Sequence, residues 1–195
     1  MARRRPRGDD VLSGRTLRRG GRQASAQGAD PRAVAETVVD PELPVLTLAD
    51  LGVLRDVRTE DDGTVVVDIT PTYAGCPAMR AMRADLVRTL RDAGFEQVDV
   101  RTVLTPAWST DWISPDGRRK LAQAGIAPPG DAVERSPGPV PLDLARPRRP
   151  VACPLCGSAD TEAVGEFGAT ACTALRRCRA CQEPFEHVKE CPSST

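Results

Sequence analysis

The sequence predicts an α+β protein, a small α-β-β-α-β-α sandwich followed by a C-terminal zinc-ribbon module. Two observations predict this class. Between residues 30 and 130, apolar residues alternate with polar ones in some stretches and recur every three or four residues in others, which is typical of strands and helices around one core. Between residues 151 and 191, paired cysteines stand where apolar residues are too few for a core, so we expect a metal to stabilise this segment.

The first domain begins with a predicted short helix, which a predicted β-hairpin follows. Asp30 followed by Pro31 predicts a short helix to about Val39, because an Asp side chain caps exposed amides and proline fits the first helical position. Residues 53–59 and 64–70 alternate between apolar and polar side chains and are joined by an Asp-Asp-Gly turn. This pattern predicts a β-hairpin.

The second half of the domain begins with a helix over residues 77–93, whose apolar residues recur on one face and which Gly94 ends. Residues 97–104 alternate again and predict a third strand. Ser114 and Pro115 open a last helix that ends near Gly125. The apolar face of the first of these helices consists of Met79, Met82, Leu86 and Leu90.

Composition divides the chain into four segments. Residues 1–29 form an Arg-rich leader, which we expect to be disordered, and residues 30–130 form the first domain. Residues 131–150 are a Pro-rich linker, and residues 151–191 are the ribbon. No stretch reaches the roughly 20 apolar residues of a membrane span, and the leader lacks the apolar segment of a secretory signal. We therefore expect a cytoplasmic protein that makes no membrane contact.

The chain has seven cysteines but one histidine, His187. An odd number of cysteines that includes two CxxC pairs favours metal ligation in a reducing compartment over a disulfide framework. A single imidazole excludes His-rich metal hydrolase sites and disfavours a serine triad. Thiol and thiolate chemistry is therefore what the composition predicts.

The first candidate site is Cys76, which lies between Gly75 and Pro77 directly before a predicted helix. We expect Cys76 to be the N-cap residue, where backbone amides and the helix dipole stabilise a thiolate and hold its pKa below the ~8.5 of an ordinary thiol. Such a thiolate suits iron, copper or a cluster. The other interpretation is a small buried apolar residue without a chemical role.

The second candidate site is the ribbon, where two Cys-x-x-Cys pairs are separated by 21 residues. Each pair fits one tight turn with both sulfurs directed at one tetrahedral ion, so the spacing predicts a structural Zn²⁺ site. We expect residues 161–167 and 173–177 to pair as strands of the ribbon. The predicted ligands are Cys153, Cys156, Cys178 and Cys181.

Other residues of the ribbon leave alternatives for the identity of the metal and for the choice of its ligands. A rubredoxin-like iron centre also takes four cysteines, although Gln182 rather than a glycine follows the second pair. Cys172, Cys191 and His187 are additional ligand candidates, and a four-coordinate ion has no place for all of them.

Trp108 and Trp112 fall in one loop of a chain whose aromatic content is 3%. Two interpretations compete, since the indoles either attach the last helix to the sheet or form an exposed anchor for a partner. We favour the core interpretation.

Two sets of motifs lie in order along the first domain. The first set is DPELP at 40–44, DLGVLR at 50–55 and TPTYAGCPAM at 70–79. These three motifs, in this order, resemble the iron-sulfur assembly domain family that includes SufT. The second set is PAWSTDWIS at 106–114, GRRKL at 117–121 and GIAPP at 125–129. Together with the ribbon, the second set resembles the PaaD family, also called PaaJ.

The resemblance implies an accessory role. Proteins of the PaaD family accompany the bacterial phenylacetyl-CoA oxygenase, a diiron enzyme with a flavin and [2Fe-2S] reductase, and their relatives help to mature iron-sulfur centres. The resemblance implies a role in phenylacetate catabolism. It also implies that the partners are the oxygenase and reductase subunits and the iron-sulfur cluster assembly machinery. Whether the chain forms a homodimer is left open. The family's reactive cysteine corresponds to Cys76, where iron or an iron-sulfur cluster would bind transiently, and Thr72 lies in the same loop.

The acidic positions of the family correspond to Asp40, Glu42 and Asp50. Carboxylates near a thiolate could share a metal or tune its basicity, but Asp40 and Asp50 equally fit turn and cap positions.

Other function classes stay open. A thiol oxidoreductase at Cys76 is disfavoured because no resolving cysteine lies at CxxC spacing from it. A zinc-ribbon nucleic-acid binder is disfavoured by balanced charge, 27 basic against 27 acidic residues, and by few stacking aromatics. A purely structural subunit of the oxygenase complex is the third alternative.

Overall fold

The computed structural model describes residues 28–73, 75–130 and 150–190. The predicted leader and Pro-rich linker therefore lie almost entirely outside the described residues, as does Cys191. Within these ranges no helix is long and apolar enough to cross a membrane.

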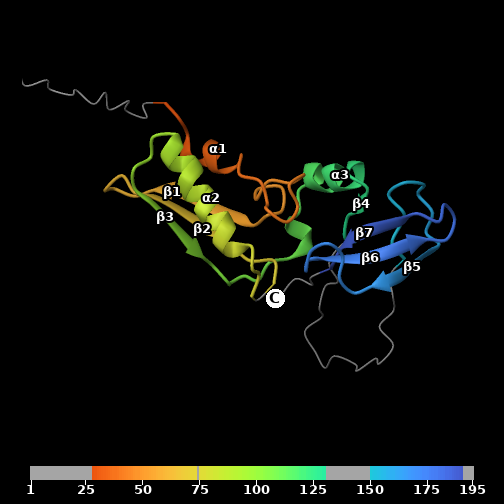
Figure 1. Ribbon diagram of the computed structural model, residues 1–195. Coiled ribbons are helices and arrows are strands. Elements are labelled where there is room, and N and C mark those ends of the chain that lie inside the picture. The colour runs from red at the N-terminus through yellow and green to blue at the C-terminus, as the bar shows by residue number, and fades with distance from the viewer. Residues whose placement is uncertain (1–27, 74, 131–149, 191–195) are drawn as a thin grey trace, which may run out of the picture.

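The first domain contains α1 (Pro31–Ala35), β1 (Leu54–Thr59), β2 (Val65–Ile69), α2 (Met79–Asp92) and β3 (Val98–Thr102). Its three strands form a mixed sheet in the order β1-β2-β3. β1 and β2 are antiparallel, whereas β2 and β3 are parallel and are joined by a helical crossover, as parallel neighbours require. Figure 1 shows α1 and α2 on one face of this sheet.

The core of the domain lies between the sheet and α2. The central strand β2 is buried at four of its five positions, which explains its continuous run of valines. The face of α2 that meets it carries Met82, Leu86 and Leu90, all 2% exposed or less. The predicted α+β class and the order α-β-β-α-β-α are confirmed.

The last part of the first domain carries a short 3₁₀ turn at Thr110–Trp112, α3 (Pro115–Gln123) and the two-residue strand β4 (Ile126–Ala127). Ser114 caps α3, because its hydroxyl accepts a hydrogen bond from the amide of Gly117 at 2.9 Å.

The core interpretation of the tryptophan pair is confirmed for Trp108. It is 5% exposed, and its indole N–H donates to the carbonyl of Leu51 at 2.8 Å. Trp112 is partly buried beneath the guanidinium of Arg55, which lies 3.6 Å from the ring centre.

The ribbon forms a second sheet in the order β4-β7-β6-β5. It consists of β5 (Thr161–Gly165), β6 (Thr173–Cys178) and β7 (Pro184–Val188). The predicted pairing of the first two strands is confirmed. Neither β7 nor its parallel pairing with β4 was predicted from the sequence. This pairing joins Ile126 to Glu186 and Ala127 to His187. Val188, at the end of β7, is buried in the core of the first domain, so the ribbon is packed against that domain.

Two predicted helix boundaries are wrong. α1 ends at Ala35 rather than near Val39, since the chain turns there and Val39 pairs with Thr47 in an isolated bridge. α2 begins at Met79, with Ala78 rather than Cys76 as its N-cap.

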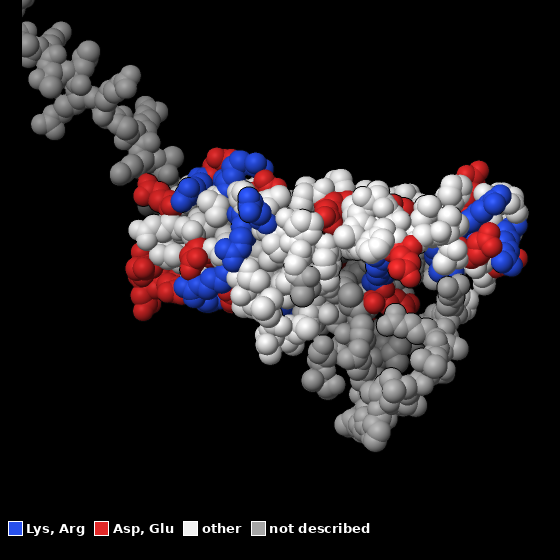
Figure 2. All heavy atoms as spheres, turned by 60° about the horizontal axis from the view of Figure 1, so that its bottom comes forward, with Lys and Arg blue, Asp and Glu red and all other residues white. Residues whose placement is uncertain are grey.

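Charged side chains do not form a single patch of one sign on the visible face. Figure 2 shows basic and acidic side chains side by side at both ends of that face, with mainly uncharged residues between them.

Gly52 provides a test of the packing between the first domain's loop and Trp112. Its φ is +67°, and a Cβ added there would lie 2.6 Å from the Cβ of Trp112. Gly63 also has a positive φ, +84°, but its Cβ would meet nothing. We expect Gly63→Ala to cost about 1 kcal/mol through backbone strain and Gly52→Ala about 3 kcal/mol, because a clash is added. Urea unfolding of both variants measures this, and equal costs would contradict the packing.

Candidate functional site

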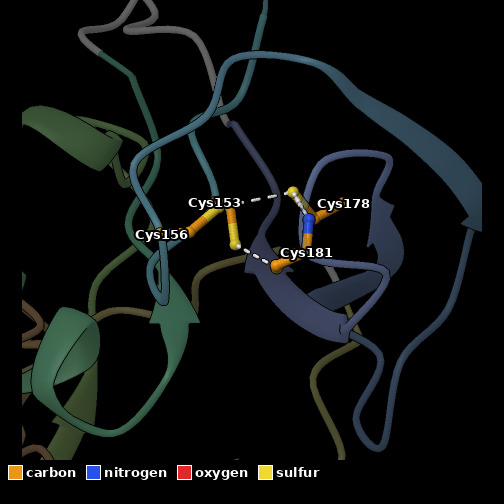
Figure 3. A group of neighbouring side chains, drawn as sticks. All are labelled: Cys153, Cys156, Cys178 and Cys181. Atoms are coloured by element: carbon orange, nitrogen blue, oxygen red, sulfur yellow. Dashed lines mark hydrogen bonds between the residues drawn. The ribbon is translucent and has the colours of Figure 1, made fainter.

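The first candidate site is the cysteine group of the ribbon. Cys153 and Cys156 precede β5, whereas Cys178 ends β6 and Cys181 follows it, so two loops present the four thiols to one point (Figure 3). The sulfurs of Cys153 and Cys181 are 3.8 Å apart, those of Cys156 and Cys178 are 3.6 Å apart, and all four lie within 4.8 Å of one another. The predicted ligands therefore converge.

These distances fit a tetrahedral thiolate site. With metal–sulfur bonds of ~2.3 Å, two ligands of a tetrahedral ion are separated by roughly 3.8 Å. The amide of Cys181 points at the sulfur of Cys178 at 3.5 Å, and this hydrogen bond lowers the pKa of Cys178 to about 7. A Zn²⁺ ion held here would be a closed, structural ion, because four protein ligands leave no open position.

The turn after the second Cys pair shows how a non-glycine residue is accommodated. Gln182 has a φ of +66°, in the region that glycine favours. The side-chain Nε2 of Gln182 donates to the backbone carbonyl of Arg179 at 2.6 Å, and its side-chain Oε1 accepts from the guanidinium of Arg177 at 2.7 Å. These hydrogen bonds stabilise the left-handed backbone conformation of Gln182, which a glycine would adopt without them.

Neither of the additional candidates that the structure describes joins this cluster. His187 is buried on β7, and burial together with the charge of Arg176 lowers its pKa to about 4, so the imidazole is neutral. Cys172 lies elsewhere, on the loop between β5 and β6.

The second cluster surrounds a cavity of about 300 Å³ between the first domain and the ribbon. Its walls are largely apolar and include Leu43, Leu51, Met82, Trp108, Phe167 and Val188. Four of the five predicted residues of the first site line it, namely Asp40, Glu42, Thr72 and Cys76. The structure therefore brings together residues from two separate loops of the first domain. The cavity is also lined by Tyr73, Cys172 and Lys189, which no sequence pattern assigned to this site.

Cys76 differs from its prediction in two ways. It lies before the N-cap residue Ala78 and is half-buried. Burial raises the pKa of the Cys76 thiol, as do the negative charges of Glu42 and Asp40, and these effects outweigh the hydrogen bonds from the amides of Ala78 and Met79. The predicted lowering of the pKa is therefore wrong, because the helix amides act on a thiol that is also desolvated and faces two carboxylates.

The acidic loop has a structural part and a part that faces the cavity. Asp40 is 3% exposed, and one of its carboxylate oxygens accepts hydrogen bonds from the amides of Glu42 at 2.8 Å and Leu43 at 2.7 Å. Asp40 therefore holds the turn that presents Glu42. Burial raises the pKa of the Asp40 carboxyl against the effect of these two amides. The carboxylate of Glu42 accepts a hydrogen bond from the Cys172 thiol, with 3.8 Å between sulfur and oxygen.

Asp50 is not among the residues that line the cavity. Its carboxylate accepts from the ammonium of Lys120 at 2.5 Å and from the amide of Thr47 at 3.0 Å, and the hydroxyl of Ser114 lies 3.3 Å away. Burial acts to raise the pKa of Asp50, but the bonds from Lys120 and Thr47 outweigh it and the pKa is lowered. Asp50 thus ties the 47–50 turn to α3, in agreement with its interpretation as a turn and cap residue.

The environment of the cavity also changes the pKa of Cys172, the ribbon cysteine that lines it. Burial, and after it the charge of Glu42, raise the pKa of Cys172 to about 11 against the hydrogen bond from Thr170. Both cavity thiols are therefore protonated at neutral pH, and metal binding to either must release a proton.

Comparison with known proteins matches both halves of the chain. Residues 32–104 match the family model of an iron-sulfur cluster assembly protein, and residues 137–189 match that of the PaaD zinc beta ribbon domain. An Escherichia coli (strain K12) protein whose name makes it a component of the 1,2-phenylacetyl-CoA epoxidase is 41% identical over 80% of this chain and 89% of its own length.

Two further similarities are confined to part of the chain. The Fe-S protein maturation auxiliary factor SufT of Staphylococcus aureus (strain USA300) is 34% identical over 40% of this chain and 88% of its own. A solved domain of unknown function, DUF59, from Bacillus anthracis is 28% identical, with a TM-score of 0.43 over 47% of this chain and 87% of that one.

The ribbon predicts a metal content. We expect about one zinc ion per chain to survive extensive dialysis, because four thiolates bind it, and Cys156→Ser to release it. Elemental analysis of the purified proteins measures this. Cys172→Ser is the matched control and should retain the zinc. Retention by the Cys156 variant together with loss from the control would show that the ligands are assigned wrongly.

The cavity predicts an unreactive thiol at Cys76. Site-resolved alkylation against pH should give a midpoint above that of an ordinary thiol, because burial and Glu42 disfavour the thiolate. Glu42→Gln should lower the midpoint, since it removes a negative charge. The control is Glu96→Gln, beyond the far end of α2 and so about 20 Å away along the helix, which should leave it unchanged. A midpoint at or below the ordinary value in the unmodified chain would contradict this environment.

Proposed function

This chain belongs to the PaaD family, that of the Escherichia coli epoxidase component, and from that premise we propose that it is an accessory subunit that assists insertion of iron or an iron-sulfur centre into the 1,2-phenylacetyl-CoA epoxidase system. In this proposal Cys76 receives the metal and passes it on, and the chain itself turns over no organic substrate. The proposed partners are the oxygenase and reductase subunits and the iron-sulfur assembly machinery.

The observation that carries this proposal is the cavity that holds Cys76. A cysteine thiol, the carboxylate of Glu42 and the hydroxyl of Thr72 line one space with largely apolar walls. Sulfur and carboxylate ligands together suit iron, and apolar walls limit the access of water to a thiolate–metal bond. Similarity to the Staphylococcus aureus maturation factor supports the same assignment for the first domain.

The loading step requires no redox partner. The Cys76 thiol loses its proton as its sulfur bonds to the incoming ferrous ion, and the proton leaves to solvent. Transfer reverses this, since a ligand of the client displaces the sulfur, which then regains a proton. A protonated resting thiol favours release over retention, as a carrier requires.

We assign docking of the client to the ribbon. Large apolar side chains are exposed there, with Leu155 at 58%, Val164 at 57% and Phe167 at 67%. Exposed apolar residues on a metal-stabilised module suit a protein partner. Arg179 is paired with Glu162 at 2.9 Å and with Asp160 at 3.9 Å, so this arginine is already neutralised within the ribbon, which gives no support to the nucleic-acid alternative.

The proposal predicts that Cys76→Ser keeps the fold but loses support of the epoxidase. In a host that lacks the native gene, we expect phenylacetyl-CoA-dependent oxygen consumption to fall by about ten-fold or more, together with the iron content of the purified oxygenase. Circular dichroism and ribbon zinc content check the fold, and Cys191→Ser controls for removal of a thiol. Full activity in the Cys76→Ser strain would exclude the proposed role of this cysteine.

A further inference from the structure

Cys172 lines the same cavity as Cys76, although it belongs to the ribbon. It is not one of the four clustered ribbon cysteines, and it is half-buried on the loop between β5 and β6. Among the described residues of the ribbon, Cys172 is therefore the only cysteine whose thiol lines the cavity that holds Cys76.

The loop that carries Cys172 is held by hydrogen bonds on both sides. The backbone amide of Lys189 donates to the carbonyl of Cys172 at 2.9 Å, and the Lys189 ammonium donates to the carbonyl of Ala171 at 2.9 Å. The carboxylate of Glu186 accepts from the amide of Ala169. Because Lys189 follows β7 and Glu186 lies on it, the position of Cys172 is set by the strand that packs against the first domain.

The distance between the Cys172 sulfur and the Glu42 carboxylate is close to that between two ligands of one metal ion. The sulfur lies 3.8 Å from a carboxylate oxygen of Glu42. For bonds of ~2.3 Å to sulfur and ~2.1 Å to oxygen, two ligands of a tetrahedral ion are roughly 3.6 Å apart. An ion between these two atoms would need little movement of either side chain. The Cys76 sulfur lines the same cavity but does not complete a group at the 4.8 Å spacing of the ribbon thiols, so Cys76 would have to move toward this pair as the ion binds.

We propose that Cys172, Cys76 and Glu42 form one metal site shared by the two domains, with a ferrous ion as its cargo. The inference rests on the proposed function and deepens it, because the ribbon then supplies a ligand as well as a docking surface. Two thiolates and a carboxylate suit a borderline divalent ion, and the apolar walls keep the site dry.

Loading this site is an exchange of protons for a metal ion. The two thiols each lose a proton to solvent as their sulfurs bond to Fe²⁺, and the carboxylate of Glu42 bonds without proton loss. No group is oxidised or reduced. Release is the reverse exchange, in which ligands of the client displace the two sulfurs and the carboxylate and each thiol regains a proton.

Anaerobic titration with Co²⁺, a spectroscopic probe for thiolate ligands, tests the proposal in the full chain with zinc in the ribbon. The unmodified protein should bind one Co²⁺ with a thiolate-to-metal charge-transfer band. Cys172→Ser and Cys76→Ser should each reduce the band to roughly half and weaken binding about ten-fold or more, whereas Glu42→Gln should weaken binding but keep both sulfurs. Circular dichroism and zinc content check that each variant is folded.

The possible results separate the two proposals. A band that halves in Cys76→Ser but is unchanged in Cys172→Ser overturns the shared site and leaves the proposed function standing. A band that halves in Cys191→Ser instead assigns the second sulfur elsewhere and also overturns it. Absence of any band in the unmodified protein overturns the site, and the strain experiment on Cys76 then decides the function independently.

Discussion

Two residues at the end of the first domain, Ile126 and Ala127, pair with β7 and make the ribbon sheet continuous with the domain that precedes it. The same strand ends in Val188, which is 3% exposed within the core of the first domain. The cavity exists because of this packing, since the ribbon supplies Phe167, Val188 and Lys189 to its walls. Whatever holds β7 in place therefore also holds the cavity.

The molecule thus separates two uses of sulfur. In the ribbon, four thiols at tetrahedral spacing make a closed site, where a metal would stabilise a module whose own apolar cluster is small. In the cavity, thiols lie beside carboxylates, and burial raises the pKa of both Cys76 and Cys172. The first arrangement favours permanent binding and the second favours exchange, which is the distinction that an assembly factor needs between its own metal and its cargo.

Local patterns in the sequence were sufficient to predict what depends on neighbours in the chain. The spacing of the cysteine pairs predicted which four cysteines cluster in the ribbon, and the 3.6-residue periodicity predicted α2. The predicted pKa of Cys76 was wrong because its determinants, burial and Glu42, come from tertiary packing. Cys172 and Glu42 are 130 residues apart in sequence, and no periodicity links them. The strand β4 has two residues, too few to show an alternation.

X-ray absorption at the iron edge tests the central claim, that both domains hold one ferrous ion, most directly. The sample is the full chain loaded anaerobically with Fe²⁺ while zinc occupies the ribbon. The account predicts a first shell that contains two sulfur atoms together with oxygen, and the loss of one sulfur in the Cys172→Ser protein. A first shell with one sulfur or none in the unmodified chain would contradict it.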